Sequence, residues 1–322
     1  MINFVINRKN QILLEKVVKR DIDTYWNEFV YSYPVWLVQT YYFLNKYSDL
    51  DITYASKPII NKINVVHVDY FRYNIADYKC FYCILLSDKE IVPFGATYIV
   101  QNRSQIINNN FYWVPHWPQP NLKFEDENKL ERIGYAGMEF NFNCKLIDFF
   151  RSNNFSFKFI KSHEWNNYLD IDIIVAIRDF SSNLHDEKPP TKLLNAWKAK
   201  KLFISGSESA YRQLGIPNIN YIEVNSIEEL QYVLSDVKSN MSKYKEIINN
   251  GYIESLKYTN LNISLVWENV LKNQISVDFN SFKKPMFIKF YKNLFLYKVK
   301  NYSKAVVLKT KNEIKKIKIF GT

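Results

Sequence analysis

The sequence contains few cysteines, histidines and glycines. Its 322 residues include only 3 Cys, 4 His and 7 Gly. Three cysteines give an odd count with no disulfide framework, and so few Cys and His residues do not make up a zinc-ligand set. The pair Cys80-x-x-Cys83 opens the apolar run to Leu86, in which residues three apart face opposite sides of a strand. We therefore expect no metal site, no redox function and a reducing, cytoplasmic location.

The sequence also lacks long uncharged apolar segments. No run reaches the roughly 18 apolar residues that a membrane-spanning helix requires. The N-terminal segment Met1–Arg8 has no basic stretch before an apolar one, so it predicts a first strand and not a signal peptide. With 47% hydrophobic and 17% aromatic residues, a chain of this length has enough apolar surface for two domain cores.

Positive charge is concentrated at the C-terminal end. The net charge is +11, and the segment 276–322 contains 12 lysines against Asp278 and Glu313, so the remainder is nearly neutral. Lysines interleaved with aromatic and aliphatic residues are typical of an amphipathic segment on an anionic membrane surface. A terminal helix packed on the core and a nucleic-acid-binding tail are the alternatives. We expect a peripheral protein of the inner membrane face that binds no specific nucleic acid.

Strand and helix patterns alternate in two blocks, which predicts an α/β protein with two parallel sheets. Three prolines between Pro115 and Pro120 exclude helix or central strand and predict a stiff connector. We therefore expect domains at 1–122 and 123–275, and a lysine-rich tail at 276–322. The strands expected in the first domain are Asn3–Ile6, Asp51–Tyr54, Asn64–Val68, Phe81–Leu86, Ala96–Val100 and Tyr112–Val114, with a helix at Val35–Tyr47.

Polar residues gather at the strand ends of the region Asp170–Arg212. A buried strand, Ile171–Ile177, runs into Arg178, and Pro189-Pro190-Thr191 predicts a helix start with Thr191 as N-cap. Ligands of open parallel sheets bind beyond the carboxyl ends of the strands, near helix N-termini. Arg178, Lys188 and Lys192 therefore predict a diphosphate site, although Arg178 has Asp179 and Asp186 as alternative partners.

Three motifs carry a family resemblance: Tyr168-x-Asp170-x-Asp172 before a buried strand, Lys188-Pro-Pro-Thr-Lys192-Leu-x-Asn195-Ala-Trp197, and Ser207-Glu-Ser-Ala-Tyr-Arg212 after the next strand. Together they resemble the donor half of GT-B glycosyltransferases of the "glycosyl transferases group 1" family. The resemblance implies two Rossmann-like domains facing a cleft and a nucleotide diphosphate sugar as donor substrate, with no cofactor. Asn195 stands where the family has an acidic residue, and Lys200-Lys201-Leu202 replaces its Gly-x-Pro turn.

Several further residues are candidates for donor contact. The glycines of Gly134-x-x-Gly137 predict a turn after a strand, where Gly137 lets phosphates approach the backbone. His163 lies in a loop after a strand, and in similar enzymes that loop meets the nucleotide base. Asp170 and Asp172 sit at a helix end and a strand start, so we expect no metal there. The donor-binding set is Gly137, His163, Arg178, Lys188, Thr191, Lys192 and Asn195.

A general base for an acceptor hydroxyl is expected on the facing edge of the first domain. Polar residues at its strand ends and in the connector are the candidates, each of which has a turn or cap role as its alternative: Asp88, His116, Asp69 and His67. A retaining enzyme needs no dedicated base.

The sequence thus predicts a glycosyltransferase that uses a nucleotide diphosphate sugar and a glycan or lipid-linked acceptor in bacterial surface polysaccharide synthesis. A non-catalytic nucleotide-sugar or glycan-binding protein of the same fold is the main alternative, suggested by Asn195. A nucleic-acid binder driven by the tail is the third.

Overall fold

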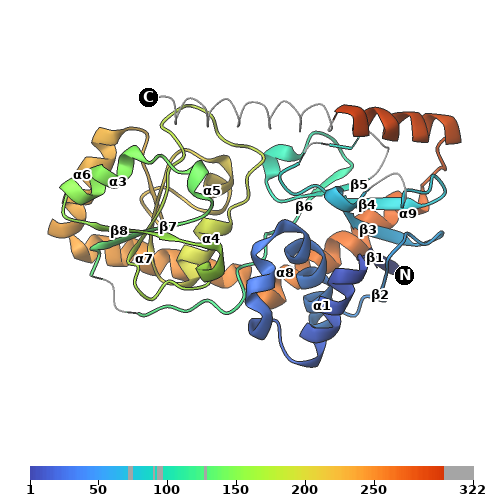
Figure 1. The fold of residues 1–322 in the computed structure, drawn as a ribbon, viewed down its shortest axis with the longest axis horizontal. Coiled ribbons are helices and arrows are strands. Elements are labelled where there is room, and N and C mark those ends of the chain that lie inside the picture. Colours follow the sequence, from blue (N-terminus) through green and yellow to red (C-terminus); the bar gives the residue numbers. More distant parts are fainter. Residues whose placement is uncertain (72–74, 90, 93–96, 127–128, 301–322) are drawn as a thin grey trace, which may run out of the picture.

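The computed structural model describes residues 1–300 except 72–74, 90, 93–96 and 127–128. Figure 1 shows two α/β domains side by side, each built on a parallel sheet. The expected fold class, two Rossmann-like domains that face a cleft, is confirmed. Ala96 and the tail from residue 301 lie outside the described residues.

The first domain contains a six-stranded parallel sheet in the order β2-β1-β3-β4-β5-β6. Its strands are buried apolar runs, as is typical of parallel sheets covered on both faces. Every strand expected here is present, with slightly different ends. The strands are β1 Ile2–Val5, β2 Ile52–Ala55, β3 Ile63–His67, β4 Phe81–Leu85, β5 Thr97–Val100 and β6 Phe111–Trp113.

Helices cover one face of this sheet. Helix α1 (Arg8–Lys19), whose first turn is capped by the Asn7 side chain, was not among the expected elements. The helix expected at Val35–Tyr47 is present. It begins with a π-helical turn, Pro34–Gln39, and continues as α2, Thr40–Tyr47. Short helices fill the connections: Asp23–Val30, Val68–Tyr70 and Arg103–Gln105.

The opposite face of the sheet is covered by loops and by a helix formed by residues 287–300. Phe290 and Leu294 of this helix are 5% and 2% exposed and join the same cluster as Val66 and Ile84 of the sheet. The C-terminal segment up to residue 300 therefore belongs structurally to the first domain. No helix in the described part of the chain combines the length and apolar character needed to cross a bilayer.

The second domain contains a five-stranded parallel sheet in the order β11-β10-β9-β7-β8. Its strands are β7 Arg132–Ala136, β8 Ser156–Ile160, β9 Ile173–Ala176, β10 Leu202–Ser205 and β11 Ile222–Glu223. Its helices are α3 Lys145–Ser152, α4 Thr191–Lys198, α5 Ser209–Leu214, α6 Ile227–Ser239 and α7 Met241–Ser255, with short helices at Glu139–Asn141 and Ser162–Glu164.

Gly134 lies inside β7 and not in the turn that the sequence predicted. A Cβ at this position would meet Ile171 Cδ1 at 2.8 Å, so glycine here makes room for the Ile171 side chain and does not form a bend. Gly137 does follow the strand end and lies in the turn.

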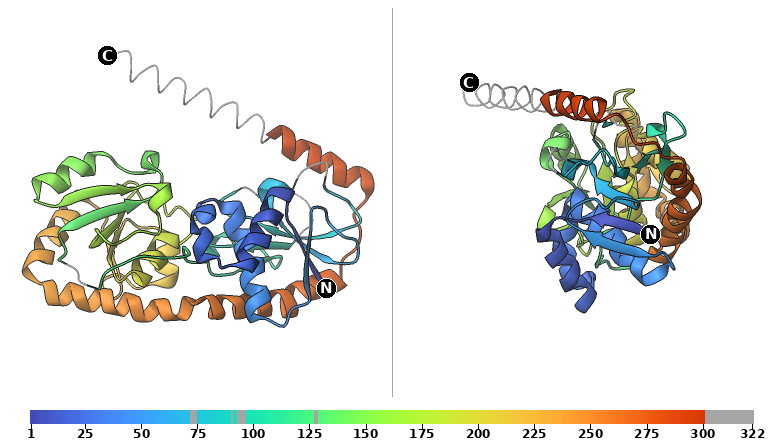
Figure 2. Two further views of the ribbon diagram at one scale, coloured as in Figure 1. Left: turned by 60° about the horizontal axis from the view of Figure 1, so that its bottom comes forward. Right: turned by 90° about the vertical axis from the view of Figure 1, so that its right-hand side faces the viewer.

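After α7 the chain crosses back to the first domain. The short helix Leu256–Tyr258 leads into α8 (Asn260–Asn269), a π-helical segment (Val270–Ile275) and α9 (Ser276–Asn280), which lie along the first domain and continue the line of α7 in the left view of Figure 2. Ile263 and Trp267 are fully buried in the first domain's core, where Trp267 contacts Trp36. The expected range 123–275 thus includes helices that pack against the first domain.

Candidate active site

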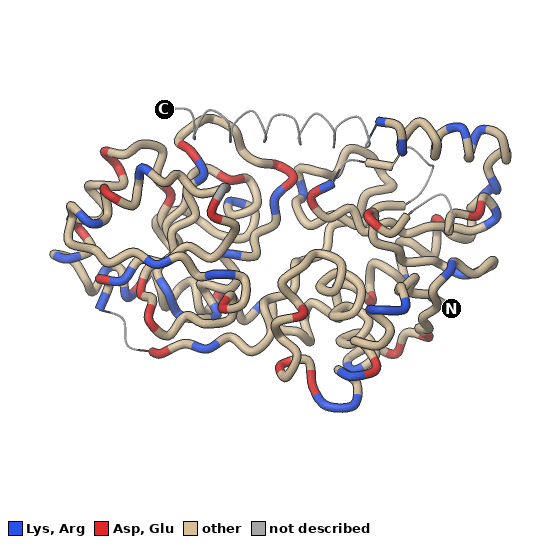
Figure 3. Tube along the Cα trace, in the orientation of Figure 1, with Lys and Arg blue, Asp and Glu red and all other residues tan. Residues whose placement is uncertain are grey.

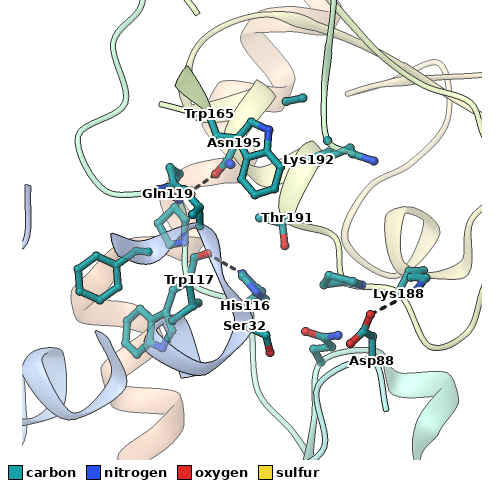
Figure 4. A pocket seen from close by; sticks show the side chains of 18 of the residues that line it. Ser32, Asp88, His116, Trp117, Gln119, Trp165, Lys188, Thr191, Lys192 and Asn195 are labelled. Atoms are coloured by element: carbon teal, nitrogen blue, oxygen red, sulfur yellow. Dashed lines mark hydrogen bonds and ion pairs between the residues drawn. The ribbon is translucent and has the colours of Figure 1, made fainter. Parts of the chain in front are cut away.

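A cavity of about 320 Å³ lies between the domains, where the strands of both sheets end. Ser87 and Gln101 line it from the loops after β4 and β5, and Gly137 and Arg178 line it from the loops after β7 and β9. Figure 4 shows side chains from both domains pointing into this space. The cavity therefore occupies the position where open parallel sheets bind ligands.

Three cationic side chains meet at the second-domain wall. Lys188, in the loop before α4, places Nζ 3.3 Å from Asp88 Oδ2 across the cleft. Lys192, in the first turn of α4, places Nζ 3.3 Å from the Tyr135 hydroxyl and 4.5 Å from the centre of its ring. Burial, and then the charge of Arg178, lower the pKa of Lys192 to about 7. An anion in the cavity would therefore favour the protonated form of the Lys192 amine.

The third cation, Arg178, pairs with Glu208 and not with Asp179 or Asp186. Arg178 Nε lies 3.1 Å from Glu208 Oε1, and the side chains are 17% and 3% exposed. Burial disfavours the charge of Arg178, but Glu208, together with Tyr211 and Tyr135, outweighs that effect and raises its pKa. Glu208 Oε2 has no hydrogen-bond partner in the described part of the chain. The pair leaves Arg178 charged and fixed at the cavity wall.

Helix α4 begins differently from the expectation. Pro190 occupies the N-cap position, with φ −80° and ψ 17°, and Thr191 is the first helical residue, so the prediction of Thr191 as N-cap was wrong. Proline fits here because its φ is already helical and it has no N–H to satisfy. The first intrahelical bond runs from Leu194 N–H to the Pro190 carbonyl at 3.1 Å. The N–H groups of the first turn therefore have no partner within the helix.

Asn195 faces the cavity from the same helix, but its oxygen has a protein partner. It is 6% exposed, and its Oδ1 accepts the backbone N–H of Gln119 at 3.0 Å, drawn as a dashed line in Figure 4. An amide at this position thus links α4 to the proline-rich connector.

His116 lines the cavity from that connector. Its Nδ1 lies 2.6 Å from the Trp117 carbonyl oxygen, which only accepts, so Nδ1 carries the proton and Nε2 is an acceptor. Burial lowers the pKa of His116 to about 4, and the ring is neutral at physiological pH. A neutral imidazole with Nε2 unprotonated has the protonation state required of a general base.

A chain of hydrogen bonds runs behind Asp88. His67 Nδ1 accepts the Asp69 backbone N–H at 3.2 Å, so His67 Nε2 is the donor to Ser32 Oγ at 2.8 Å. Ser32 Oγ lies 2.8 Å from Ser87 Oγ, which lies 3.5 Å from Asp88 Oδ1. Because Nδ1 of His67 is an acceptor, His67 cannot deprotonate Ser32, and a Ser-His-Asp nucleophile is excluded. Burial of Asp88 opposes its ionisation, but Lys188 and Lys89 outweigh burial and lower its pKa.

Most of the residues proposed from the sequence meet at the cavity: Asp88, His116, Gly137, Arg178, Lys188, Thr191, Lys192 and Asn195. Three others are not on its wall. His67 is fully buried behind Ser32, and the Asp69 side chain is 53% exposed beside it. His163 lies in the short helix Ser162–Glu164, whereas its neighbour Trp165 reaches the cavity.

Sequence reasoning missed several cavity residues, which are Ser32, Gln119, Trp165 and Tyr211, and the Arg178 partner Glu208. The Asp172 carboxylate pairs with Arg132, whose Nη2 lies 2.8 Å from Oδ1. Among the described residues, no group of three or more His, Cys, Asp or Glu side chains is placed to hold a metal ion.

Hydrogen bonds between the domains close the cleft on one side. Asn102, fully buried after β5, donates to Ser209 Oγ at 2.9 Å and to the Lys188 carbonyl at 3.1 Å. Its Oδ1 accepts from Gln213 Nε2 at 2.7 Å. The loop that carries Lys188 is thus tied to the first domain.

No protein-family model and no curated protein sequence matches the chain. Solved structures similar to it include TarM of S. aureus (TM-score 0.49, 12% identity), where the match covers 74% of this chain and 58% of that chain. Others are Anabaena HepE with UDP and glucose (TM-score 0.43, 10% identity, 66% and 72% covered) and the sucrose-phosphate synthase of Thermosynechococcus elongatus (TM-score 0.45, 9% identity, 67% and 74% covered). The chain spans less than two thirds of the length of TarM. Similarity at this level does not assign a function to the chain.

Proposed function

We propose that the chain is a glycosyltransferase that transfers a sugar from a nucleoside diphosphate donor to a glycan or lipid-linked glycan acceptor. The observation that carries this proposal is the meeting of Arg178, Lys188 and Lys192 at the carboxyl edge of the second sheet. Three cations around the start of one helix suit a diphosphate, which is both the donor's anchor and the leaving group.

Catalysis on this proposal is electrostatic at the leaving group. As the glycosidic bond breaks, negative charge grows on the diphosphate. Cations that are already held in place stabilise this charge best, because they do not have to rearrange during the reaction. Arg178 is held by Glu208, and the Lys188 loop is held by Asn102. The first-turn N–H groups of α4 add donors at the same place.

The first domain supplies the acceptor side. His116 Nε2 faces the cavity as a proton acceptor, and it is our choice for the group that receives the proton of the attacking hydroxyl. Asp88, an ionised carboxylate on the wall of the same cavity, is our choice for the group that orients acceptor hydroxyls. From the second domain, Trp165 adds apolar surface suited to a sugar ring.

The test has two stages. Thermal melting with UDP, GDP, ADP and CDP and their sugars identifies the donor, because a ligand that binds only the folded chain stabilises it in proportion to its affinity. Release of labelled sugar from that donor, with and without glycan acceptors, then measures turnover. If none of these nucleotides raises the melting temperature, the proposal is wrong. Binding without turnover would support a non-catalytic nucleotide-sugar-binding protein, which the engagement of Asn195 with Gln119 favours.

A further inference from the structure

The helix formed by residues 287–300 has two apolar faces. One packs on the first domain through Phe290 and Leu294. The other is exposed: Ile288, Phe295 and Val299 are 73%, 59% and 50% accessible. At 100° per residue these three side chains fall within a 40° stripe that points away from the packed face.

Lysines border the exposed stripe. The segment 283–300 contains six lysines, all exposed, and no acidic residue. Helical spacing places Lys292 and Lys289 on one side of the stripe and Lys298 on the other. Figure 3 shows these basic positions along the helix at the outer edge of the first domain.

We propose that residues 283–300 form a docking surface for an anionic lipid bilayer. The stripe enters the headgroup layer, the lysines contact lipid phosphates, and Phe290 and Leu294 transmit the attachment to the domain core. This proposal goes beyond the transferase activity and does not depend on it.

The charge pattern selects this partner over two others. A second copy of the chain would bring a second lysine-rich surface against the first, which is repulsive. A nucleic acid would satisfy the lysines but leave Ile288, Phe295 and Val299 without apolar partners.

The experiment uses the full chain and vesicles in co-sedimentation, without donor or acceptor. Binding is expected to phosphatidylcholine vesicles containing one third phosphatidylglycerol, with weakening in high salt, and not to phosphatidylcholine alone. The double variant Ile288→Glu/Phe295→Glu should weaken binding more than about tenfold, because it removes two side chains that enter the lipid. Lys289→Gln and Lys292→Gln should each weaken it roughly fivefold.

The matched control is Ile216→Glu/Ile219→Glu, which changes two exposed isoleucines of the second domain, 61% and 52% accessible, and should bind like the unaltered chain. All variants should melt like the unaltered protein because the changed side chains are exposed. The proposal is overturned if the chain ignores anionic vesicles or if the helix variants bind them undiminished. It is equally overturned if the apolar variant instead abolishes a dimer in analytical ultracentrifugation, or if the lysine variants lose RNA or DNA binding while the apolar variant keeps it.

Discussion

Lys188 Nζ lies 3.3 Å from Asp88 Oδ2, and this ion pair joins the loop before α4 to the end of β4 across the cleft. Asp88 is thus the partner of Lys188, which on our proposal binds the donor diphosphate. Entry of the donor therefore has to separate or share this pair.

Removing the Asp88 charge should strengthen nucleotide binding. Asp88→Asn frees Lys188 and deletes a negative charge beside the diphosphate. Because both side chains are partly exposed, we expect a gain of only about two- to fivefold in affinity for the nucleoside diphosphate, measured by calorimetry. Asp126→Asn, which removes the partner of Lys200 away from the cavity, is the control and should change nothing. Weaker binding in Asp88→Asn would place the phosphates elsewhere.

Lys192→Ala should markedly lower the affinity for the same nucleoside diphosphate. Loss of one charge-assisted contact costs about 1.5–3 kcal/mol, or roughly ten- to a hundredfold in affinity. Lys198→Ala is the matched control, since Lys198 lies on the same helix but lines a different cavity beside the proline-rich connector. Equal affinities of the two variants in calorimetry would remove Lys192 from the donor site.

Donor binding should depend on pH through Lys192. Its pKa of about 7 in the free protein means that about nine-tenths of the amines are neutral at pH 8. A diphosphate favours the protonated form, so binding should take up a proton at pH 8, and affinity should fall by up to about tenfold per pH unit above 7. Calorimetry in buffers of different ionisation enthalpy measures the uptake, which Lys192→Met should abolish.

The same group predicts the opposite trend for stability. Its folded pKa lies below the ordinary lysine value of 10.5, so the unfolded chain binds more protons between about pH 7 and 10.5. This contribution to the free energy of unfolding of the free protein therefore rises with pH in that window. Lys192→Met should flatten the rise in urea denaturation, whereas an unchanged slope would contradict the assigned pKa.

Asn195 should serve both the donor and the link to the connector. Asn195→Ala leaves the Gln119 N–H without its acceptor, which costs about 1–3 kcal/mol of stability. The same change should weaken donor binding and raise the donor KM. Asn195→Asp keeps an acceptor for that N–H and adds one for ribose hydroxyls, so melting temperature and donor KM should stay near those of the unaltered protein. If both variants leave donor KM unchanged, Asn195 is only structural.

The sheets and the cation cluster could be predicted because their signals are local. Apolar runs such as Ile173–Ala176 end in polar residues, and parallel strands bring those ends to one edge. Helix α1 was missed because charged residues interrupt its apolar positions, of which Leu13, Leu14 and Val17 are buried.

Partners distant in sequence gave no such signal. Ser32 and Ser87 are 55 residues apart, so their contact exists only once the first domain has folded. Gln119 and Asn195 are 76 apart, and their contact requires the connector to pack against the second domain. The amphipathic tail was visible in its charge pattern. The helix 287–300 packs on a face of the first sheet that loops cover only in part. Sequence spacing does not show which side of the helix meets that face.

The return of the chain to the first domain sets the order in which the domains can be completed on the ribosome. All strands of the second sheet, from Arg132 to Glu223, and its last helix, to Ser255, are synthesised as one contiguous block. The first sheet is made earlier, but Trp267 and Leu294, which belong to its two clusters, are synthesised only after this block. The first domain is therefore completed only after the second has been synthesised, and part of its apolar surface stays uncovered until then.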